Sequence, residues 1–336
     1  MKSATPARLV EIDGLRGIAA LGVAVFHLKI LLQGDPNPLS AIWGADLILQ
    51  KGWHLVDLFF VLSGFIFAHG YLRDGVMRAG VGLRSFAYAR FSRLWPLHAA
   101  VLGFTGIMLF DDPDTTAFNF VMSLAMLHVF LPDVEVLNPP VWSISVEVIC
   151  YVVFAALALQ NDRRILLFGA CALVLVGGFF VWFEFAPKIG RGLLGFFLGT
   201  LVYRFRDRLG DIPLALLCAA VALFGFLDGS YASLLIETLI CWPAAILLAP
   251  RLTFLCWPAF QWLGSRSYAI YIVHVPIYIF VGNILMLLPY SSSELKILTG
   301  LGVALLISDI LHRRLEIPAQ TFLRRHAYLQ PQPAAR

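Results

Sequence analysis

Charged residues are scarce in this chain. They make up 14% of its 336 residues, and hydrophobic residues make up 60%, whereas soluble domains hold about 25% and about 45 to 50% respectively. This scarcity excludes an ordinary soluble domain and predicts an all-α, polytopic integral membrane protein. The formal net charge of +4 is too small to predict a nucleic-acid partner.

Cysteine pairs with a recognisable spacing are also lacking. The chain's cysteines lie in or beside apolar runs and are Cys150, Cys171, Cys218, Cys241 and Cys256. None belongs to a Cys-x-x-Cys or Cys/His pattern, so we expect small core residues and no metal site. No small-residue cleavage site follows Ile30, so we expect the first apolar segment to stay as a helix rather than act as a signal peptide.

Long apolar stretches, by contrast, are abundant, and ten approach the roughly 17 to 25 residues that cross a bilayer. They are residues 17–33, 53–72, 94–110, 142–160, 165–183, 190–205, 212–228, 232–249, 266–288 and 295–311. An eleventh, 116–132, lies between an Asp-rich and a Pro-rich segment, and we expect it to be re-entrant or interfacial. We see no internal repeat, so we expect a single membrane domain over 1–320 and a cytoplasmic tail over 321–336.

The basic residues favour this topology. With ten spans and both termini in the cytoplasm, most arginines fall on the cytoplasmic side: Arg73, Arg78, Arg84, Arg90, Arg93, Arg163, Arg164, Arg204, Arg206, Arg208, Arg251, Arg266, Arg313, Arg314, Arg324 and Arg325. The basic residues on the outer side are Lys29, Lys51, Lys188, Arg191 and Lys296. This bias follows the positive-inside rule, and a full span at 116–132 would invert it.

Two ionisable residues interrupt the first span, which reads DGLRGIAALGVAVFHL. Arg16 and His27 are eleven residues apart, a rotation within about 20° of three full helical turns. They therefore share one face of the helix and lie roughly 16 Å apart along its axis. A ligand that touches both is long, anionic at one end and reactive at the other. The alternative is that Arg16 extends to the lipid headgroups and His27 makes a polar contact in the bundle.

A second pattern, ARFSRLWPLH, places Arg90 and Arg93 three residues apart. Two guanidinium groups on one side of a helical turn can clamp a phosphate. We expect Pro96 to lie in the first turn of the span that follows. The alternative is ordinary cytoplasmic anchoring by positive charge.

Other polar side chains at membrane depth are candidates for function, because burying them costs free energy. Asp57 in the second span or Glu147 in the fourth is expected to orient the imidazole of His27. Ser63 is more simply explained by helix packing at Ser63-Gly64, and His274 by an aromatic packing face. The candidate donors to a reacting carbonyl oxygen are Trp142, Ser143 and Ser145.

Taken in order, these motifs resemble the membrane-bound acyltransferase family 3. The resemblance runs from DGLRGIAALGVAVFH through VDLFFVLSGFI, RFSRLWP, VWSISVE and SYAIYIVH to RRLEIP, which holds Glu316 and Pro318. One departure is WSISVEVICY where the family often has WSLSVEEQFY, so that Val148 replaces an acid and Glu147 keeps any carboxylate role. Many relatives also carry an SGNH-type domain, and we expect this chain to be the stand-alone membrane form.

The resemblance implies a multi-pass protein of the bacterial inner membrane with no permanently bound cofactor. It would transfer an acetyl or other short acyl group from cytoplasmic acyl-CoA, the donor co-substrate, to a hydroxyl of a surface or exported glycan. It implies His27 as general base and Arg16, Arg90 and Arg93 as donor-binding residues. Direct transfer and a covalent acyl-enzyme on Ser63 or His27 both remain open. The rival hypothesis is a transporter or flippase that uses Arg16, His27 and Glu147 as a relay.

Overall fold

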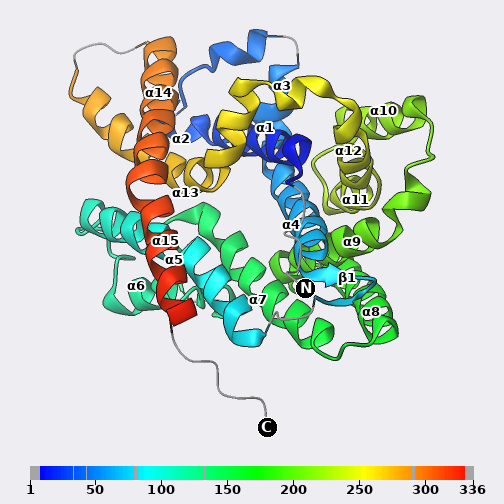
Figure 1. The fold of residues 1–336 in the computed structure, drawn as a ribbon. Helices are drawn as coiled ribbons and strands as arrows, with labels where there is room; N and C mark the ends of the chain where they lie inside the picture. The colour runs from blue at the N-terminus through cyan, green and yellow to red at the C-terminus, as the bar shows by residue number, and fades with distance from the viewer. Residues whose placement is uncertain are drawn as a thin grey trace.

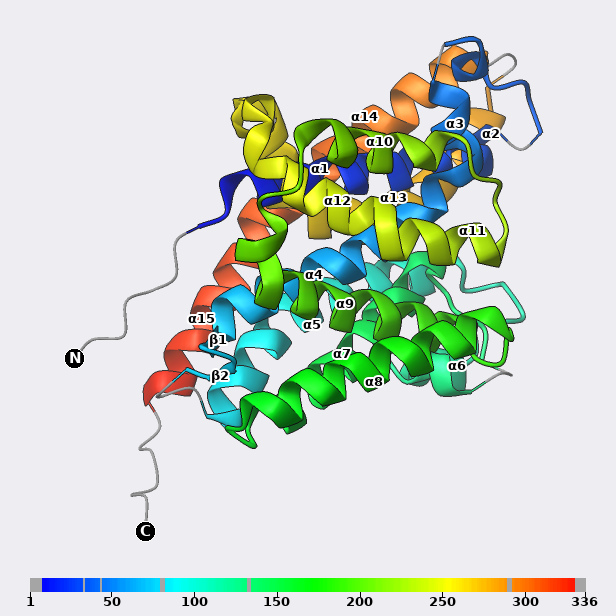
Figure 2. The same cartoon turned by 90° about the vertical axis from the view of Figure 1, so that its right-hand side faces the viewer.

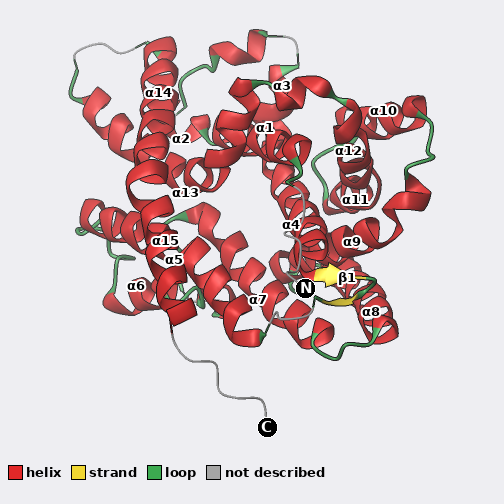
Figure 3. Ribbon diagram, in the orientation of Figure 1, coloured by secondary structure: helices red, strands yellow, loops and turns green. Residues whose placement is uncertain are grey.

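The described part of the structure, a computed structural model, is almost entirely helical (Figure 3). It comprises residues 8–32, 34–42, 44–78, 82–131, 134–288 and 292–329. The α-helices are α1 (Val10–Phe26), α2 (Leu28–Leu32), α3 (Ala45–Lys51), α4 (Leu55–Tyr71), α5 (Leu83–Met108), α6 (Ala117–Leu124), α7 (Trp142–Ala158), α8 (Arg163–Trp182), α9 (Pro187–Leu209), α10 (Leu214–Ala222), α11 (Tyr231–Ile236), α12 (Trp242–Leu248), α13 (Pro258–Met286), α14 (Ser293–Leu311) and α15 (Ile317–Leu329).

Short 3-10 and π-helical turns connect or extend these helices. The 3-10 turns are η1 (Pro38–Ala41), η2 (Gly52–His54), η3 (His128–Phe130), η4 (Pro139–Val141), η5 (Leu223–Gly225), η7 (Ala249–Arg251) and η8 (Thr253–Cys256). The π-helical turns are η6 (Glu237–Cys241) and η9 (His312–Glu316). The strands β1 (Leu72–Arg73) and β2 (Val76–Met77) form an antiparallel hairpin.

Seven helical stretches of the described residues are long and apolar enough to cross a membrane. They are Val10–Leu32, Ala45–Tyr71, Pro139–Ala158, Arg163–Trp182, Tyr231–Arg251, Pro258–Met286 and Ser293–Arg325. The predicted all-α, multi-pass membrane architecture is therefore confirmed. The other three predicted spans fall on α5, α9 and α10. The first two are long but less apolar, and α10 with η5 is short. The count of ten stays a prediction.

The ambiguous stretch 116–132 does not form a span. Its helix α6 has eight residues, a length of about 12 Å, whereas the hydrocarbon layer is about 30 Å thick. This agrees with the expectation that the stretch is re-entrant or interfacial.

Two predicted boundaries differ from the structure. Pro96 lies inside α5 rather than in the first turn of a span, because the helix begins at Leu83 and carries both Arg90 and Arg93. At the far end, α14 continues through η9 into α15, so the predicted tail begins within a helix. Residues 330–336 of that tail lie outside the described residues.

Glycines bring the central helices into backbone contact. A Cβ on Gly17 of α1 would lie 2.5 Å from the backbone N of Gly264 on α13, and a Cβ on Gly64 of α4 would overlap the carbonyl of Phe196 on α9. Small residues permit such close approach between membrane helices, as the sequence predicted for Gly64. Figures 1 and 2 show α1 beside α13 and α4 beside α9.

The two ends of the molecule are distinct. In Figure 2 the start of α1, the hairpin β1–β2 and α15 lie at the left, and α3 and α6 lie at the right. Both described ends of the chain are therefore on the same side of the helical bundle, and the cytoplasmic position of the termini stays a prediction.

Candidate functional site

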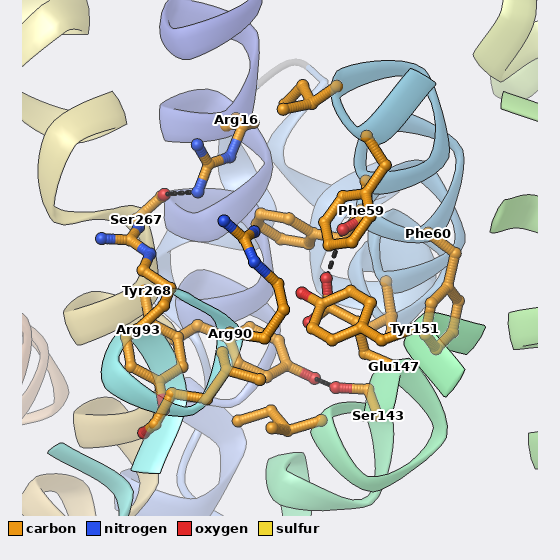
Figure 4. A pocket seen from close by; sticks show the side chains of 17 residues that line it. Arg16, Phe59, Phe60, Arg90, Arg93, Ser143, Glu147, Tyr151, Ser267 and Tyr268 are labelled. Atoms are coloured by element: carbon orange, nitrogen blue, oxygen red, sulfur yellow. Dashed lines mark hydrogen bonds between the residues drawn. The ribbon is translucent and has the colours of Figure 1, made fainter. Parts of the chain in front are cut away.

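A cavity of about 140 Å³ lies between α1, α4, α5, α7 and α13, and we call it the arginine pocket. Its lining includes Arg16, Arg90 and Arg93, which the sequence predicted as an anion-binding group. Figure 4 shows the three side chains, which come from α1 and α5, gathered at one side of this pocket. Helix packing therefore unites two motifs that are far apart along the chain.

The three arginines differ in how their charge is balanced. Arg16 lies 3.6 Å from Asp13 and donates a hydrogen bond to Ser267 Oγ at 3.1 Å. Arg93 forms an ion pair with the buried Glu316. No carboxylate among the described residues pairs with Arg90.

Aromatic rings surround Arg90 instead. Its guanidinium carbon lies 4.8 Å from the ring centre of Phe67, 5.4 Å from that of Tyr71 and 5.9 Å from that of Tyr151. Its Nε atom is buried and has no hydrogen-bond partner among the described residues. A cation held by ring faces, with a donor left unpaired, is well suited to an anionic ligand.

Glu147 is the carboxylate in the lining of the arginine pocket. It accepts a hydrogen bond from the hydroxyl of Ser63, which brings together two predicted site residues from α7 and α4. Ser143, one turn before Glu147, lies 2.7 Å from the hydroxyl of Tyr271 on α13. The wall of the pocket that these residues form therefore holds two separate hydrogen bonds made by hydroxyl groups, one of them to the acid.

His27 and His274 form a pair at the end of α1. Nδ1 of His27 lies 2.9 Å from the carbonyl oxygen of Val23 and 3.1 Å from Nε2 of His274. Nδ1 of His274 lies 3.0 Å from the carbonyl oxygen of Ile270. Because carbonyl oxygens only accept hydrogen bonds, both Nδ1 atoms carry protons, and His274 Nε2 accepts from His27. This assignment leaves Nε2 of His27 unprotonated, and it has no hydrogen-bond partner among the described residues.

The histidine pair adjoins the arginine pocket but is not part of its lining. Tyr271 connects the two, because it lines the pocket and its ring centre lies 6.1 Å from that of His274. The rings of His274 and His27 are in turn 5.0 Å apart. Arg16 and His27 both contact α13, through Ser267 and His274, so they share one face of α1 as predicted.

The expectation that Asp57 or Glu147 orients His27 is not met, because His274 occupies that place. Asp57 is fully buried and pairs with Arg191, whose Nε and Nη2 donate to its two oxygens at 3.0 and 2.7 Å. A buried carboxylate requires a cation or several hydrogen-bond donors, and Arg191 of α9 is the cation here. Arg191, expected at the outer surface, is only 6% exposed.

Two predicted carbonyl-oxygen donors lie outside the arginine pocket. The indole of Trp142 is 4.8 Å from the guanidinium carbon of Arg191, so it covers the Asp57 ion pair.

The hydroxyl of Ser145, the second of these donors, lies 3.1 Å from Nε2 of His128 in η3. Burial, with smaller effects from His98 and Lys188, lowers the pKa of His128 to about 4, so that ring is neutral near pH 7. The contact between Ser145 and His128 connects η3 to α7.

Comparison with known proteins identifies the family. An acyltransferase-domain family model matches residues 9–313. The chain belongs to the acyltransferase 3 family. Its match to "Protein 2 in picA locus" of Rhizobium radiobacter is 29% identical over 202 residues, which cover 52% of this chain and 97% of that protein.

A second relative of this acyltransferase 3 protein is "Acyltransferase MdmB" of Streptomyces mycarofaciens, 28% identical over 157 residues. That match covers 44% of this chain and 38% of MdmB, so the chain spans well under two thirds of that relative. No solved structure matches the chain. Family membership and the apolar helices together support a membrane acyltransferase.

Sequence reasoning missed several partners in this family member. Arg191 had no role assigned, and the contact between His274 and His27 was not foreseen. Glu316 belonged to a recognised motif, but its pairing with Arg93 and, at 2.8 Å, with Nδ1 of His312 was not predicted. All of these are contacts between residues distant in sequence or held by a π-helical turn, for which one sequence carries little signal.

Proposed function

We propose that this protein is a transmembrane O-acyltransferase that moves an acetyl or similar short acyl group from acyl-CoA to a hydroxyl of a surface or exported glycan. The observation that carries the proposal is the convergence of Arg16, Arg90 and Arg93 on one pocket that adjoins a histidine pair. The proposed setting is the bacterial inner membrane, with the arginine pocket reached from the cytoplasm.

The donor's phosphates are proposed to bind the arginine pocket. Among the described residues Arg90 has no counter-ion and its buried Nε donor has no partner, so it is the strongest phosphate ligand of the three. The remaining charges, Arg16 and Arg93, are already partly balanced by Asp13 and Glu316. At about 140 Å³ the cavity suits phosphate groups or the thin pantetheine arm, because ligand pockets for larger molecules are usually about 300 Å³ or more.

His27 is proposed to act as general base through its free Nε2. The proton of the acceptor hydroxyl passes to this nitrogen as the hydroxyl oxygen attacks the thioester carbonyl. The tetrahedral intermediate then breaks its carbon–sulfur bond, and the leaving thiolate takes the proton from His27. Such base catalysis contributes about 10² to 10⁴-fold to a rate. His274 keeps the imidazole in the required tautomer.

Glu147 and Ser63 are proposed to complete the pocket. Their hydrogen bond places a negative charge opposite three guanidinium groups, and this charge keeps the empty pocket from being strongly cationic. Ser143 and Tyr271 lie on the same wall and are the candidate donors to a carbonyl oxygen.

The decisive experiment compares the wild-type protein with His27→Gln in reconstituted membranes. Acetyl transfer from acetyl-CoA to a glycan acceptor, followed by mass spectrometry, should fall by about 10² to 10⁴-fold, while acetyl-CoA binding should persist. A matched control is His69→Gln, which changes a histidine outside the pocket lining and the histidine pair. Unchanged transfer by His27→Gln would contradict the proposal, and failure of the wild type to bind acetyl-CoA would favour a transporter instead.

A further inference from the structure

A second basic cavity, of about 270 Å³, lies at the hairpin and is separate from the arginine pocket. Its lining joins the β1–β2 hairpin to the start of α8 and the end of α9, and it shares no residue with the arginine pocket. We call it the hairpin pocket. Its charged lining residues are Arg73, Asp74, Arg78, Arg163, Arg204, Arg206 and Asp207.

Three of these arginines are not balanced by carboxylates. Arg73 lies 3.8 Å from Asp74, and Arg206 lies 3.4 Å from Asp207. Among the described residues no carboxylate pairs with Arg78, Arg163 or Arg204, so the hairpin pocket carries an excess of positive charge. Like charges gathered around one cavity repel each other, and an anion bound between them relieves this repulsion.

One of the unbalanced arginines also has an unused donor. Nη2 of Arg78 donates to the carbonyl oxygen of His69 at 3.0 Å, which fixes the guanidinium in place. Its Nε atom is buried and has no partner among the described residues. Buried donors nearly always have a partner, so this N–H indicates a site for an acceptor.

The local backbone makes the site rigid. Asp74 and Gly75 have φ values of 53° and 83°, as the tight turn of a two-residue hairpin requires. A Cβ on Gly75 would lie 3.2 Å from Cβ of Arg163, so the turn is packed against the first residue of α8. The carboxylate of Asp162 accepts a hydrogen bond from the Arg164 N–H at 2.7 Å, which fixes the start of this helix.

The surroundings of the hairpin pocket suit a lipid. Of the seven candidate spans, α8 is the least covered by protein, with 22% of its apolar window buried. Phe168 on its first turns is 69% exposed, and Leu166 and Leu167 line the pocket itself. Figure 2 shows the hairpin near the start of α8 and on the side of the molecule where α15 ends. Acyl chains along α8 would place a headgroup at the arginines.

We propose that the hairpin pocket is a binding site for a phosphate group. The headgroup of an anionic lipid is the favoured source, and a soluble nucleotide phosphate is the other. The site would hold the cytoplasmic end of α4 and the hairpin in position. Because Tyr71, which precedes β1, also faces Arg90, the occupied site would steady one wall of the arginine pocket. The proposal does not depend on acyl transfer.

The test uses the full chain purified in a mild detergent. Native mass spectrometry measures binding of phosphatidic acid and phosphatidylglycerol, with phosphatidylcholine as the uncharged reference, and calorimetry measures binding of adenosine 3′,5′-bisphosphate. Arg163→Gln/Arg204→Gln should weaken binding of the favoured probe by about tenfold or more, because two charge-assisted contacts are lost. Binding should also weaken as salt is raised.

Arg164→Gln/Arg208→Gln is the matched control. It removes two charges from the same two helices, and neither residue lines the hairpin pocket, so we expect a change of less than about twofold. Arg163→Lys/Arg204→Lys keeps the charge and should retain part of the affinity. If the double glutamine variant does not fold, Arg163→Gln alone serves, because its side chain is exposed.

The outcomes separate the sources. Loss of anionic-lipid binding alone identifies a lipid site, and loss of bisphosphate binding alone identifies a nucleotide site. The proposal would be overturned if the wild type bound neither anionic lipid more tightly than phosphatidylcholine and did not bind the bisphosphate. It would also be overturned if the pocket and control variants lost equal affinity. Failure of the acyltransferase proposal would leave the difference between the pocket and control variants unchanged, because none of the four substituted arginines lines the arginine pocket.

Discussion

Two arginine sites of this protein differ in how their charge is balanced: Arg191 is buried, whereas Arg90 is half-buried with its Nε atom covered. Arg191 makes a closed, two-point ion pair with Asp57 and lies between the rings of Trp53 and Trp142. Arg90 is held by aromatic rings, and its Nε donor has no partner in the described part of the chain. A buried charge without a partner is costly, and such groups mark ligand sites in membrane proteins. Pairing therefore separates the arginine that we interpret as structural from the one that we propose as a phosphate ligand.

The strongest test of this comparison removes one partner of the closed pair. Asp57→Asn leaves Arg191 as an uncompensated buried charge, so we expect the free energy of unfolding to fall by about 3 to 5 kcal/mol. The measurement is thermal unfolding in a mild detergent. Asp57→Leu/Arg191→Met, which removes both charges, should recover much of this loss.

The control for that measurement is Asp35→Asn. Asp35 pairs with Lys296 at 2.6 Å, but its side chain is 46% exposed, so the cost should be about 1 kcal/mol or less. Equal destabilisation by Asp57→Asn and Asp35→Asn would show that the buried pair is not structural.

A smaller effect is expected when the unpaired arginine is changed. Arg90→Gln removes a charge that no described carboxylate balances, so stability should change little. Affinity for acetyl-CoA should fall by about tenfold or more, because a charge-assisted contact to phosphate is lost. Equilibrium binding to the purified protein measures this change.

Arg84→Gln is the matched control for Arg90→Gln. Arg84 lies on the same helix, α5, and outside the lining of the arginine pocket, so donor affinity should be retained. The distinction between the two arginines would be contradicted if Arg90→Gln lowered the unfolding temperature as far as Asp57→Asn does and left acetyl-CoA binding unchanged.

The smallest expected effect concerns His274, which we regard as a positioning residue. His274→Phe removes the acceptor for the Nδ1–H of His27, so kcat for acetyl transfer should fall by about tenfold, the equivalent of one hydrogen bond of about 1.4 kcal/mol. KM for acetyl-CoA should stay constant. His274→Gln supplies an amide oxygen in place of the imidazole nitrogen and should restore part of kcat.

A purely structural role of His274 makes a different prediction. It would lower the unfolding temperature of both variants and would leave the pH dependence of kcat unchanged. A positioning role should shift the pH profile of His274→Phe, because Nδ1 of His27 then keeps only the carbonyl of Val23 as its acceptor.

Much of the architecture was predictable from local patterns. Apolar runs of span length indicated helices at the correct places, and the short stretch 116–132 was recognised as too weak for a span. The spacing of Arg16 from His27 indicated one helix face, and both residues do contact α13. These predictions succeed because hydrophobicity and the 3.6-residue period act within a single segment.

The arginine pocket was predictable in part. Arg16, Arg90 and Arg93 were all expected to bind the donor, and the structure places the three in the lining of one cavity. The role of Asp57 was predicted wrongly, because its depth was clear from the sequence but its neighbour was not. The expectation for Pro96 was also wrong. Proline is common in the first turn of a helix, but here the helix begins at Leu83, thirteen residues earlier, so Pro96 lies in its interior.

Composition and periodicity alone are enough to make this chain an all-helical membrane protein, because burial of apolar surface and satisfaction of backbone hydrogen bonds in lipid leave few other choices. The partners of its buried polar groups depend on which helices pack together. Glycine contacts between α1 and α13 set His27 against His274, and those between α4 and α9 set Asp57 against Arg191. Charges in a medium of low dielectric constant take the partner that the packing brings within reach.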